Sequence, residues 1–122
     1  MEYRDVTNLF LIGTGGFLGA VCRYGTFTII PGTRGTLVVN VVGSFLLGLL
    51  LFYSDYIGYL TPRIRMFAGI GFLGAFTTFS TFIVQTMQMQ PVYGFANVMI
   101  NLTTGLIAVF LARSLIIYIG DR

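Results

Sequence analysis

The chain has 122 residues, of which 56% are hydrophobic and only 9% are charged, and its mean hydropathy is +0.88. A soluble domain carries roughly 25% charged residues, so this chain has too few charges to cover a water-facing surface. The composition therefore excludes an ordinary soluble protein and indicates an integral membrane protein.

The charge and cysteine content exclude further classes. The calculated pI is about 9.4, but the seven basic residues are all arginines and form no basic stripe, so we expect no nucleic-acid partner. The chain has no His and a single Cys, Cys22, which excludes an internal disulfide and a Cys-based zinc site. The apolar segments offer no acid, His or nucleophile–base pair, so we expect no enzymatic activity.

Long uncharged stretches divide the sequence into membrane spans. They hold 17, 20 and 47 residues and lie between Asp5 and Arg23, between Arg34 and Asp55, and between Arg65 and Arg113. A spanning helix needs about 20 residues, so the longest stretch accommodates two helices and a turn. We therefore predict an all-α membrane protein with one domain, residues 1–122, and four spans at about 6–28, 36–53, 66–87 and 92–116.

The first span is a real helix in this interpretation, because Glu2 and Asp5 cancel the positive charge that a signal peptide requires. Four spans place both termini on one side of the membrane. That side would hold five arginines: Arg4, Arg63, Arg65, Arg113 and Arg122. The other side would hold two, Arg23 and Arg34. This is a modest bias toward cytoplasmic termini, too small to fix the orientation.

Small residues recur at helical spacing in the first two spans. Gly15 and Gly19 form a G-x-x-x-G pair in the first span, and Ser44 and Gly48 form a similar pair in the second. Such pairs allow the backbones of neighbouring helices to approach closely in lipid. We expect both to be packing contacts.

The third span contains an unusual run of hydroxyl residues. Residues 76–82 read Phe-Thr-Thr-Phe-Ser-Thr-Phe and follow Gly69, Gly71 and Gly74. Four hydroxyls within five residues point all round a helix rather than along one face. One interpretation is a helix broken near its middle, which membranes tolerate only inside protein or beside a water-filled cavity. The other is a kinked helix whose hydroxyls bond to its own carbonyls.

Polar residues also form stripes on the second and fourth spans. Asn40, Ser44 and Gly48 share one helix face, and Tyr93, Asn97 and Asn101 share another. Such uncharged donors are either interhelical hydrogen-bonding groups or the lining of a passage. The central spans contain no Asp, Glu, Lys or His, so a passage would suit a neutral or anionic permeant better than a cation or a proton.

Aromatic residues add to this pattern. Phe79 and Phe82 lie at i and i+3 in the third span. A Phe ring is electropositive around its rim, so both edges can face an anion in the same passage. Taken one at a time, each ring is more simply explained by packing.

Three segments together resemble the Fluc/CrcB family of fluoride ion channels. They are residues 15–24, Gly-Gly-Phe-Leu-Gly-Ala-Val-Cys-Arg-Tyr; residues 35–45, Gly-Thr-Leu-Val-Val-Asn-Val-Val-Gly-Ser-Phe; and residues 71–82, Gly-Phe-Leu-Gly-Ala-Phe-Thr-Thr-Phe-Ser-Thr-Phe. The third segment is highly specific, and the similarity covers essentially the whole chain. The resemblance implies a multi-pass channel of the cell membrane that passively exports fluoride.

The resemblance also implies an assembly. Family members are homodimers of four-helix subunits inserted antiparallel to each other in dual topology, with two ion routes along the interface. A structural sodium ion at the centre would be held by backbone carbonyls of Gly74 and Thr77. The expected partners are therefore fluoride, sodium, a second copy of the chain and lipid.

By motif position, the resemblance assigns residues to the fluoride pathway and to its vestibule. The pathway residues would be Asn40, Thr78, Phe79, Ser80, Phe82, Tyr93, Asn97 and Asn101, and the vestibule residue would be Arg23. The chain departs from the family in two places: Gly74 is followed by Ala75 where the family often has Gly, and Asn97 and Asn101 replace residues that are often Ser.

Two other functions are weighed against a channel. Small multidrug exporters also have four spans, but they depend on a membrane-embedded carboxylate, which this chain lacks. The other alternative is a non-transporting membrane scaffold, in which the small residues only pack against partner helices.

Overall fold

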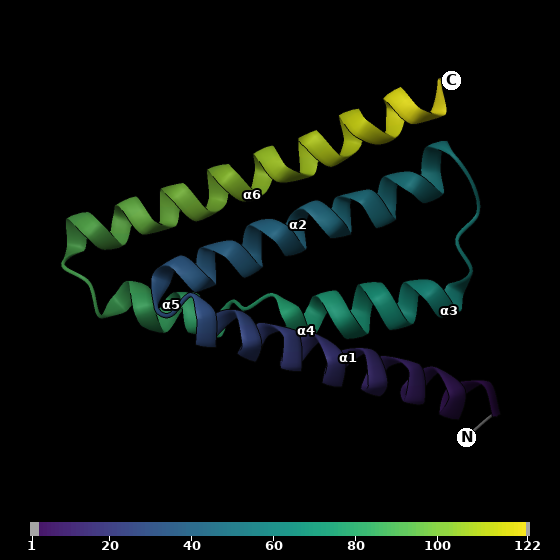
Figure 1. Ribbon diagram of the computed structural model, residues 1–122, viewed down its shortest axis with the longest axis horizontal. Helices are drawn as coiled ribbons and strands as arrows, with labels where there is room; N and C mark the ends of the chain where they lie inside the picture. The colour runs from purple at the N-terminus through teal and green to yellow at the C-terminus, as the bar shows by residue number, and fades with distance from the viewer. Residues whose placement is uncertain (1–2, 122) are drawn as a thin grey trace.

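The computed structural model describes residues 3–121, and in this range the regular secondary structure is entirely helical (Figure 1). The elements are α1 (Tyr3–Ile29), α2 (Thr33–Tyr56), α3 (Pro62–Ile64), η1 (Arg65–Leu73), α4 (Gly74–Phe76), α5 (Ser80–Met87) and α6 (Pro91–Gly120). The expected positions of the Arg4 and Arg122 side chains fall outside the described part of the chain.

Four helical segments are long and apolar enough to cross a membrane, as expected. They are Val6–Ile29, Thr33–Tyr56, Pro62–Met87 and Pro91–Gly120. The protein is therefore a multi-pass protein of a cell membrane. The helices are longer than the expected spans because residues such as Arg34 and Asp55 continue the helix beyond the apolar stretch. The described ends of α1 and α6 lie at the same end of the bundle (Figure 1).

Glycine and proline define the connections between the spans. Gly32, which precedes α2, is the one described residue with a left-handed backbone, at φ 75°. Pro62 and Pro91 occupy the first turns of α3 and α6, where a missing N–H costs no helical hydrogen bond. The Thr61 side chain accepts a hydrogen bond from Ile64 N at 3.4 Å and caps α3.

The first helix packs closely against η1, as the Gly15–Gly19 pair predicts. A Cβ added to Gly15 or Gly19 would overlap the carbonyl oxygen of Phe67 or Phe72, respectively. On the facing side, a Cβ on Gly71 would lie 2.7 Å from Ile12 O. The contact therefore joins backbone to backbone, and it requires glycine on both helices.

The second helix packs along α6, and the two run side by side in Figure 1. Gly48 faces α6, where an added Cβ would lie 2.9 Å from Ala112 Cβ. Val39 on α2 and Ala108, Ala112 and Ile116 on α6 are buried. Small side chains thus bring these two helices together, as expected for the Ser44–Gly48 pair.

The third span is interrupted near its middle, as the first of the two interpretations predicts. Helical structure ends at Phe76 and resumes at Ser80, and Thr77 adopts an extended backbone with φ −75° and ψ 162°. The preceding segment η1 is a π-helix of nine residues, which the sequence pattern does not predict. At the end of this segment, Gly74 N donates a hydrogen bond to Gly69 O, five residues earlier. Segments of π-helix are rare in proteins, and those that occur are often found at functional sites.

Many large apolar side chains remain exposed on all four spans. Examples are Phe10 and Phe17 on α1, Met87 on α5, and Phe95 and Phe110 on α6. In water this exposure would be unfavourable, but lipid chains or another subunit can cover such a surface. By contrast, the polar side chains of Asn40, Thr77 and Thr78 at the interruption of the third span are buried or half-buried.

Candidate functional site

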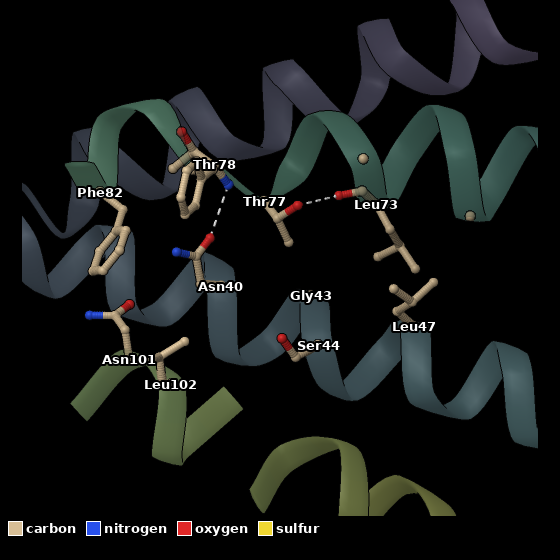
Figure 2. Close-up of a pocket in the computed structure, with 13 residues that line it drawn as sticks. Asn40, Gly43, Ser44, Leu47, Leu73, Thr77, Thr78, Phe82, Asn101 and Leu102 are labelled. Carbon is tan, nitrogen blue, oxygen red and sulfur yellow. Dashed lines mark hydrogen bonds between the residues drawn. The ribbon is translucent and has the colours of Figure 1, made fainter. Parts of the chain in front are cut away.

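The interruption of the third span is held open by Asn40 of α2. Thr77 N still donates to Leu73 O at 3.1 Å, and the Thr77 hydroxyl donates to the same carbonyl at 2.9 Å. Thr78 N would bond to Gly74 O in a continuing α-helix, but it donates to Asn40 Oδ1 at 2.9 Å instead (Figure 2). The Gly74 carbonyl is thereby released from its usual helical partner.

Thr78 begins the second half of the span. Its side-chain oxygen accepts a hydrogen bond from Thr81 N at 3.3 Å, and the two hydroxyls are 3.0 Å apart. This contact satisfies one of the free N–H groups at the start of α5. The helix is therefore broken, and the hydroxyls of Thr77, Thr78 and Thr81 stabilise the two new ends.

A pocket of about 370 Å³ lies beside the break. Its described lining contains no charged residue and comes from α2, the third span and α6: Asn40, Gly43, Ser44, Leu47, Gly69, Leu73, Gly74, Thr77, Thr78, Phe79, Phe82, Asn101 and Leu102 (Figure 2). Asn40 holds Thr78 N through its oxygen, and its Nδ2 group makes no hydrogen bond to the described residues. The pocket therefore offers neutral polar groups next to aromatic rings.

The two phenylalanines of the pocket form a tilted pair. Their ring centroids are 6.0 Å apart and the ring planes meet at 43°. Phe82 is buried, with 6% of its surface exposed, whereas Phe79 is 74% exposed in the single chain. Phe82 is thus fixed by the protein, whereas Phe79 lines the pocket and leaves most of its ring exposed on the outside of the single chain.

The structure gathers most of the expected site residues and places others elsewhere. Asn40, Thr78, Phe79, Phe82 and Asn101 line one pocket together with Gly74 and Thr77. Ser80 and Tyr93 are exposed and do not line it. Arg23 of α1 also lies outside the lining, but its Nη1 donates to Thr77 O at 3.3 Å. Its cation therefore lies at the carbonyl end of the first half of the span, where the helix dipole favours positive charge.

Comparison with known proteins identifies the family. Residues 10–113 match the sequence profile of the family described as CrcB-like protein, Camphor Resistance (CrcB). The chain belongs to the CrcB-like family.

Curated relatives of this CrcB-like chain carry a functional name. A protein named fluoride-specific ion channel FluC 2, from Methanosarcina barkeri, is 46% identical over 120 residues, covering 98% of this chain and 95% of the relative. The protein of the same name from Methanosarcina acetivorans is 42% identical over 119 residues, covering 98% and 94%. A fluoride-specific ion channel FluC from Methanocaldococcus jannaschii is 40% identical over 118 residues, covering 90% and 94%.

The CrcB-like chain also contains polar contacts that its sequence motifs do not predict. Thr36 on α2 is 1% exposed, and its hydroxyl donates to Gln85 Oε1 on α5 at 2.8 Å. Thr86, the next residue, accepts a hydrogen bond from Asn97 Nδ2 at 2.8 Å. The sequence signal for these contacts is that two polar residues, Gln85 and Thr86, lie within the apolar second half of the third span.

Asn97 and Asn101 of this CrcB-like chain are linked to each other. Asn101 Nδ2 donates to Asn97 Oδ1 at 3.1 Å and to Asn97 O at 3.0 Å. Asn101 lines the pocket, whereas Asn97 does not. Asn101 Oδ1 is buried and, within the described part of the chain, accepts no hydrogen bond. A buried acceptor of this kind is costly unless a ligand or water meets it.

Proposed function

We propose that this chain is a fluoride-selective channel that passively carries fluoride across the cell membrane. The observation that carries the proposal is the neutral pocket at the broken third span, in a chain of the CrcB-like family. The names of its relatives support fluoride as the permeant.

The chemistry of the pocket suits a small anion. Moving a bare ion into hydrocarbon costs tens of kcal/mol, so a pore has to replace the water that the ion loses. Asn40 Nδ2 can donate to the ion, and the electropositive rims of Phe79 and Phe82 can face it. Neutral groups also hold an anion loosely enough for it to leave, as conduction requires.

We assign the remaining expected residues to different parts of the route. Asn40, Thr78, Phe79, Phe82 and Asn101 would form its centre, because they line the same pocket. Exposed Ser80 and Tyr93 would contact the ion outside this centre, and Asn97 would act on it through Asn101. Arg23 would raise the local concentration of anions in a vestibule near Thr77.

A second copy of the chain would complete the route. Phe79 lines the pocket, yet 74% of its surface is exposed in the single chain. An antiparallel homodimer would cover this ring and enclose the route between two subunits. The apolar exterior of the spans supports such an interface, and the remainder of that exterior would contact lipid.

The carbonyl groups at the break fit a sodium ion in such a dimer. Unwound backbone carbonyls are the ligands that broken membrane helices offer to sodium. Gly74 O is released from its helical partner because Thr78 N bonds to Asn40. Thr77 O has one lone pair engaged by Arg23 and a second available. Two carbonyls from each subunit would share the ion, which would hold the subunits together as a structural metal.

We further propose that the chain is a channel and neither an enzyme nor a transporter of another class. The described residues contain no group of three or more His, Cys, Asp and Glu that would hold a metal. The pocket also lacks the carboxylate on which a proton-coupled multidrug exporter depends. Export of a cationic dye would support that alternative, and a dimer without any ion flux would support a scaffold.

Reconstituted protein provides the direct test. Liposomes loaded with fluoride are expected to release it when the purified protein is present, at a rate independent of a proton gradient, whereas chloride-loaded liposomes are expected to release little. A fluoride electrode and a chloride electrode measure the two rates, and empty liposomes give the background. Fluoride release at the background rate would contradict the proposed function.

The Arg23→Gln substitution separates the proposed roles of this residue. The guanidinium repels a cation bound at Thr77 O, so its removal is expected to raise sodium affinity about tenfold or more. The same change removes a positive charge that attracts anions, so fluoride flux is expected to fall. Sodium-dependent dimerisation in detergent and fluoride release from liposomes measure the two effects.

The Arg34→Gln variant is the control, because Arg34 is an exposed residue in the first turn of α2. It is expected to leave sodium-dependent dimerisation unchanged. Equal sodium affinities of Arg23→Gln and the unmodified protein would contradict a site at Thr77 O.

A further inference from the structure

We propose that Thr86, Asn97 and Asn101 form a hydrogen-bonded relay whose direction reverses when an anion enters the pocket. The proposal rests on the proposed function and deepens it, because it adds Thr86 as a positioning residue. Thr86 does not line the pocket and acts only through the two asparagines.

The relay is continuous in the structure and runs in one direction. The Thr86 hydroxyl donates to Phe82 O at 2.7 Å, so its oxygen accepts from Asn97 Nδ2 at 2.8 Å. Asn97 Oδ1 in turn accepts from Asn101 Nδ2 at 3.1 Å. Buried Gly94 allows α6 to approach α5, since an added Cβ would lie 3.1 Å from Thr86 O.

With this direction, the Asn101 atom that would face an anion is an acceptor and not a donor. The amide donors of Asn97 and Asn101 bond to Thr86 and Asn97, and in the described part of the chain Asn101 Oδ1 remains as a buried acceptor without a partner. Figure 2 shows this oxygen turned toward the side of the pocket where Asn40 and Phe82 lie. An oxygen that only accepts hydrogen bonds would repel fluoride, so the observed direction suits a pocket without an anion.

The chemistry of the three side chains allows the opposite direction. A primary amide exchanges its oxygen and its NH₂ group when it turns by half a rotation, and a hydroxyl both donates and accepts. If both amides turn, the Thr86 hydroxyl donates to Asn97 Oδ1 and Asn97 Nδ2 donates to Asn101 Oδ1. Asn101 Nδ2 then faces the pocket. Phe82 O and Asn97 O each lose a side-chain hydrogen bond, and Asn97 O then faces Asn101 Oδ1, a contact between two acceptors whose cost the bond to the anion has to offset.

The two asparagines have to turn together. If Asn101 turned alone, its oxygen would face two acceptors, Asn97 O and Asn97 Oδ1, whereas turning both amides leaves only the backbone oxygen Asn97 O opposite it. Without an anion, the observed direction makes more hydrogen bonds. With an anion, the reversed direction adds a bond to the ion. The anion thus selects the reversed state because it binds that state more tightly.

Side-chain amide NMR in liposomes tests the reversal. The chain contains only four asparagines, Asn8, Asn40, Asn97 and Asn101, so ¹⁵N-asparagine labelling gives few signals to assign. Fluoride is expected to shift the signals of Asn97 and Asn101 at the same half-saturating concentration. A shift of Asn101 with an unmoved Asn97 signal would overturn the proposal.

Substitution of Thr86 tests its role independently. Thr86→Val removes the hydroxyl and leaves Asn97 Nδ2 without its hydrogen-bond partner, so we expect about a tenfold loss of fluoride flux and a higher half-saturating concentration for the Asn101 shift. Thr86→Ser keeps a hydroxyl and is expected to restore both. Thr103→Val is the matched control, because Thr103 is exposed and bonds only to Met99 O of its own helix.

The outcomes distinguish the relay from the channel itself. Absence of fluoride flux in the unmodified protein would contradict the proposed function. Normal flux in the unmodified protein together with unchanged flux and NMR shifts in Thr86→Val would overturn the relay alone. Equal losses in Thr86→Val and Thr86→Ser, with both variants folded, would also overturn it, because the hydroxyl would then not be the active group.

Discussion

The Asn40→Asp substitution is expected to lower fluoride flux by about a hundredfold or more while the protein remains folded. Aspartate is nearly isosteric with asparagine and retains an oxygen that can accept the hydrogen bond from Thr78 N. It loses the Nδ2 donor and adds a negative charge to the pocket. Two like charges about 4 Å apart repel by about 4 kcal/mol at an effective dielectric constant near 20, which opposes entry of an anion.

Liposome efflux and size-exclusion chromatography together measure this prediction. Asn8→Asp adds the same charge to α1 at a residue that does not line the pocket, and it is expected to leave flux unchanged. Asn40→Ala removes the acceptor for Thr78 N as well, so it is expected to destabilise the break in addition to reducing flux. Normal flux in folded Asn40→Asp would show that Asn40 does not donate to the permeant.

The Gly19→Ala substitution is expected to destabilise the protein by about 3 kcal/mol or more, or to prevent folding. The added methyl group would overlap the Phe72 carbonyl oxygen and lie 2.9 Å from the carbonyl carbon. These are backbone atoms of η1, so no side chain can turn away to make room. The helices would have to separate, and the interruption that follows η1 would lose its support.

Thermal unfolding in detergent measures this effect, with Gly25→Ala as the matched control. Gly25 lies on the same helix, and an added Cβ there meets no atom within 4 Å. Alanine favours a helix over glycine by about 1 kcal/mol, so Gly25→Ala is expected to be neutral or slightly stabilising. Equal stability of Gly19→Ala and Gly25→Ala would contradict the close contact between α1 and η1.

Much of this fold could be predicted because membrane insertion leaves a strong pattern in the sequence. The uncharged stretches predicted the four spans, and the small-residue pairs predicted the close contacts between helices. The run of hydroxyls in residues 76–82 indicated an interruption but left a kinked helix as an equal alternative. Asn40 decides between them by binding Thr78 N, and that contact depends on how α2 packs beside the third span.

Other features could not be read from local patterns. The π-helix Arg65–Leu73 depends on which carbonyl each N–H selects, and its residues are equally compatible with an α-helix. Likewise, Tyr93, Asn97 and Asn101 share one helix face in the sequence, yet only Asn101 lines the pocket. The register of α6 against α5 separates these three residues, because Asn97 bonds to Thr86 and Tyr93 remains exposed.

The pairing of helices has a consequence for the order of assembly during synthesis. The main contacts join α1 to η1 and α2 to α6, so neither pair consists of consecutive spans. A nascent chain that has released only residues up to Tyr56 contains one member of each pair and neither complete pair. Insertion of the first two spans into the bilayer therefore precedes their docking. The glycine face of α1 can pack only after η1 has been synthesised, and α2 can pack against α6 only after α6 has been synthesised.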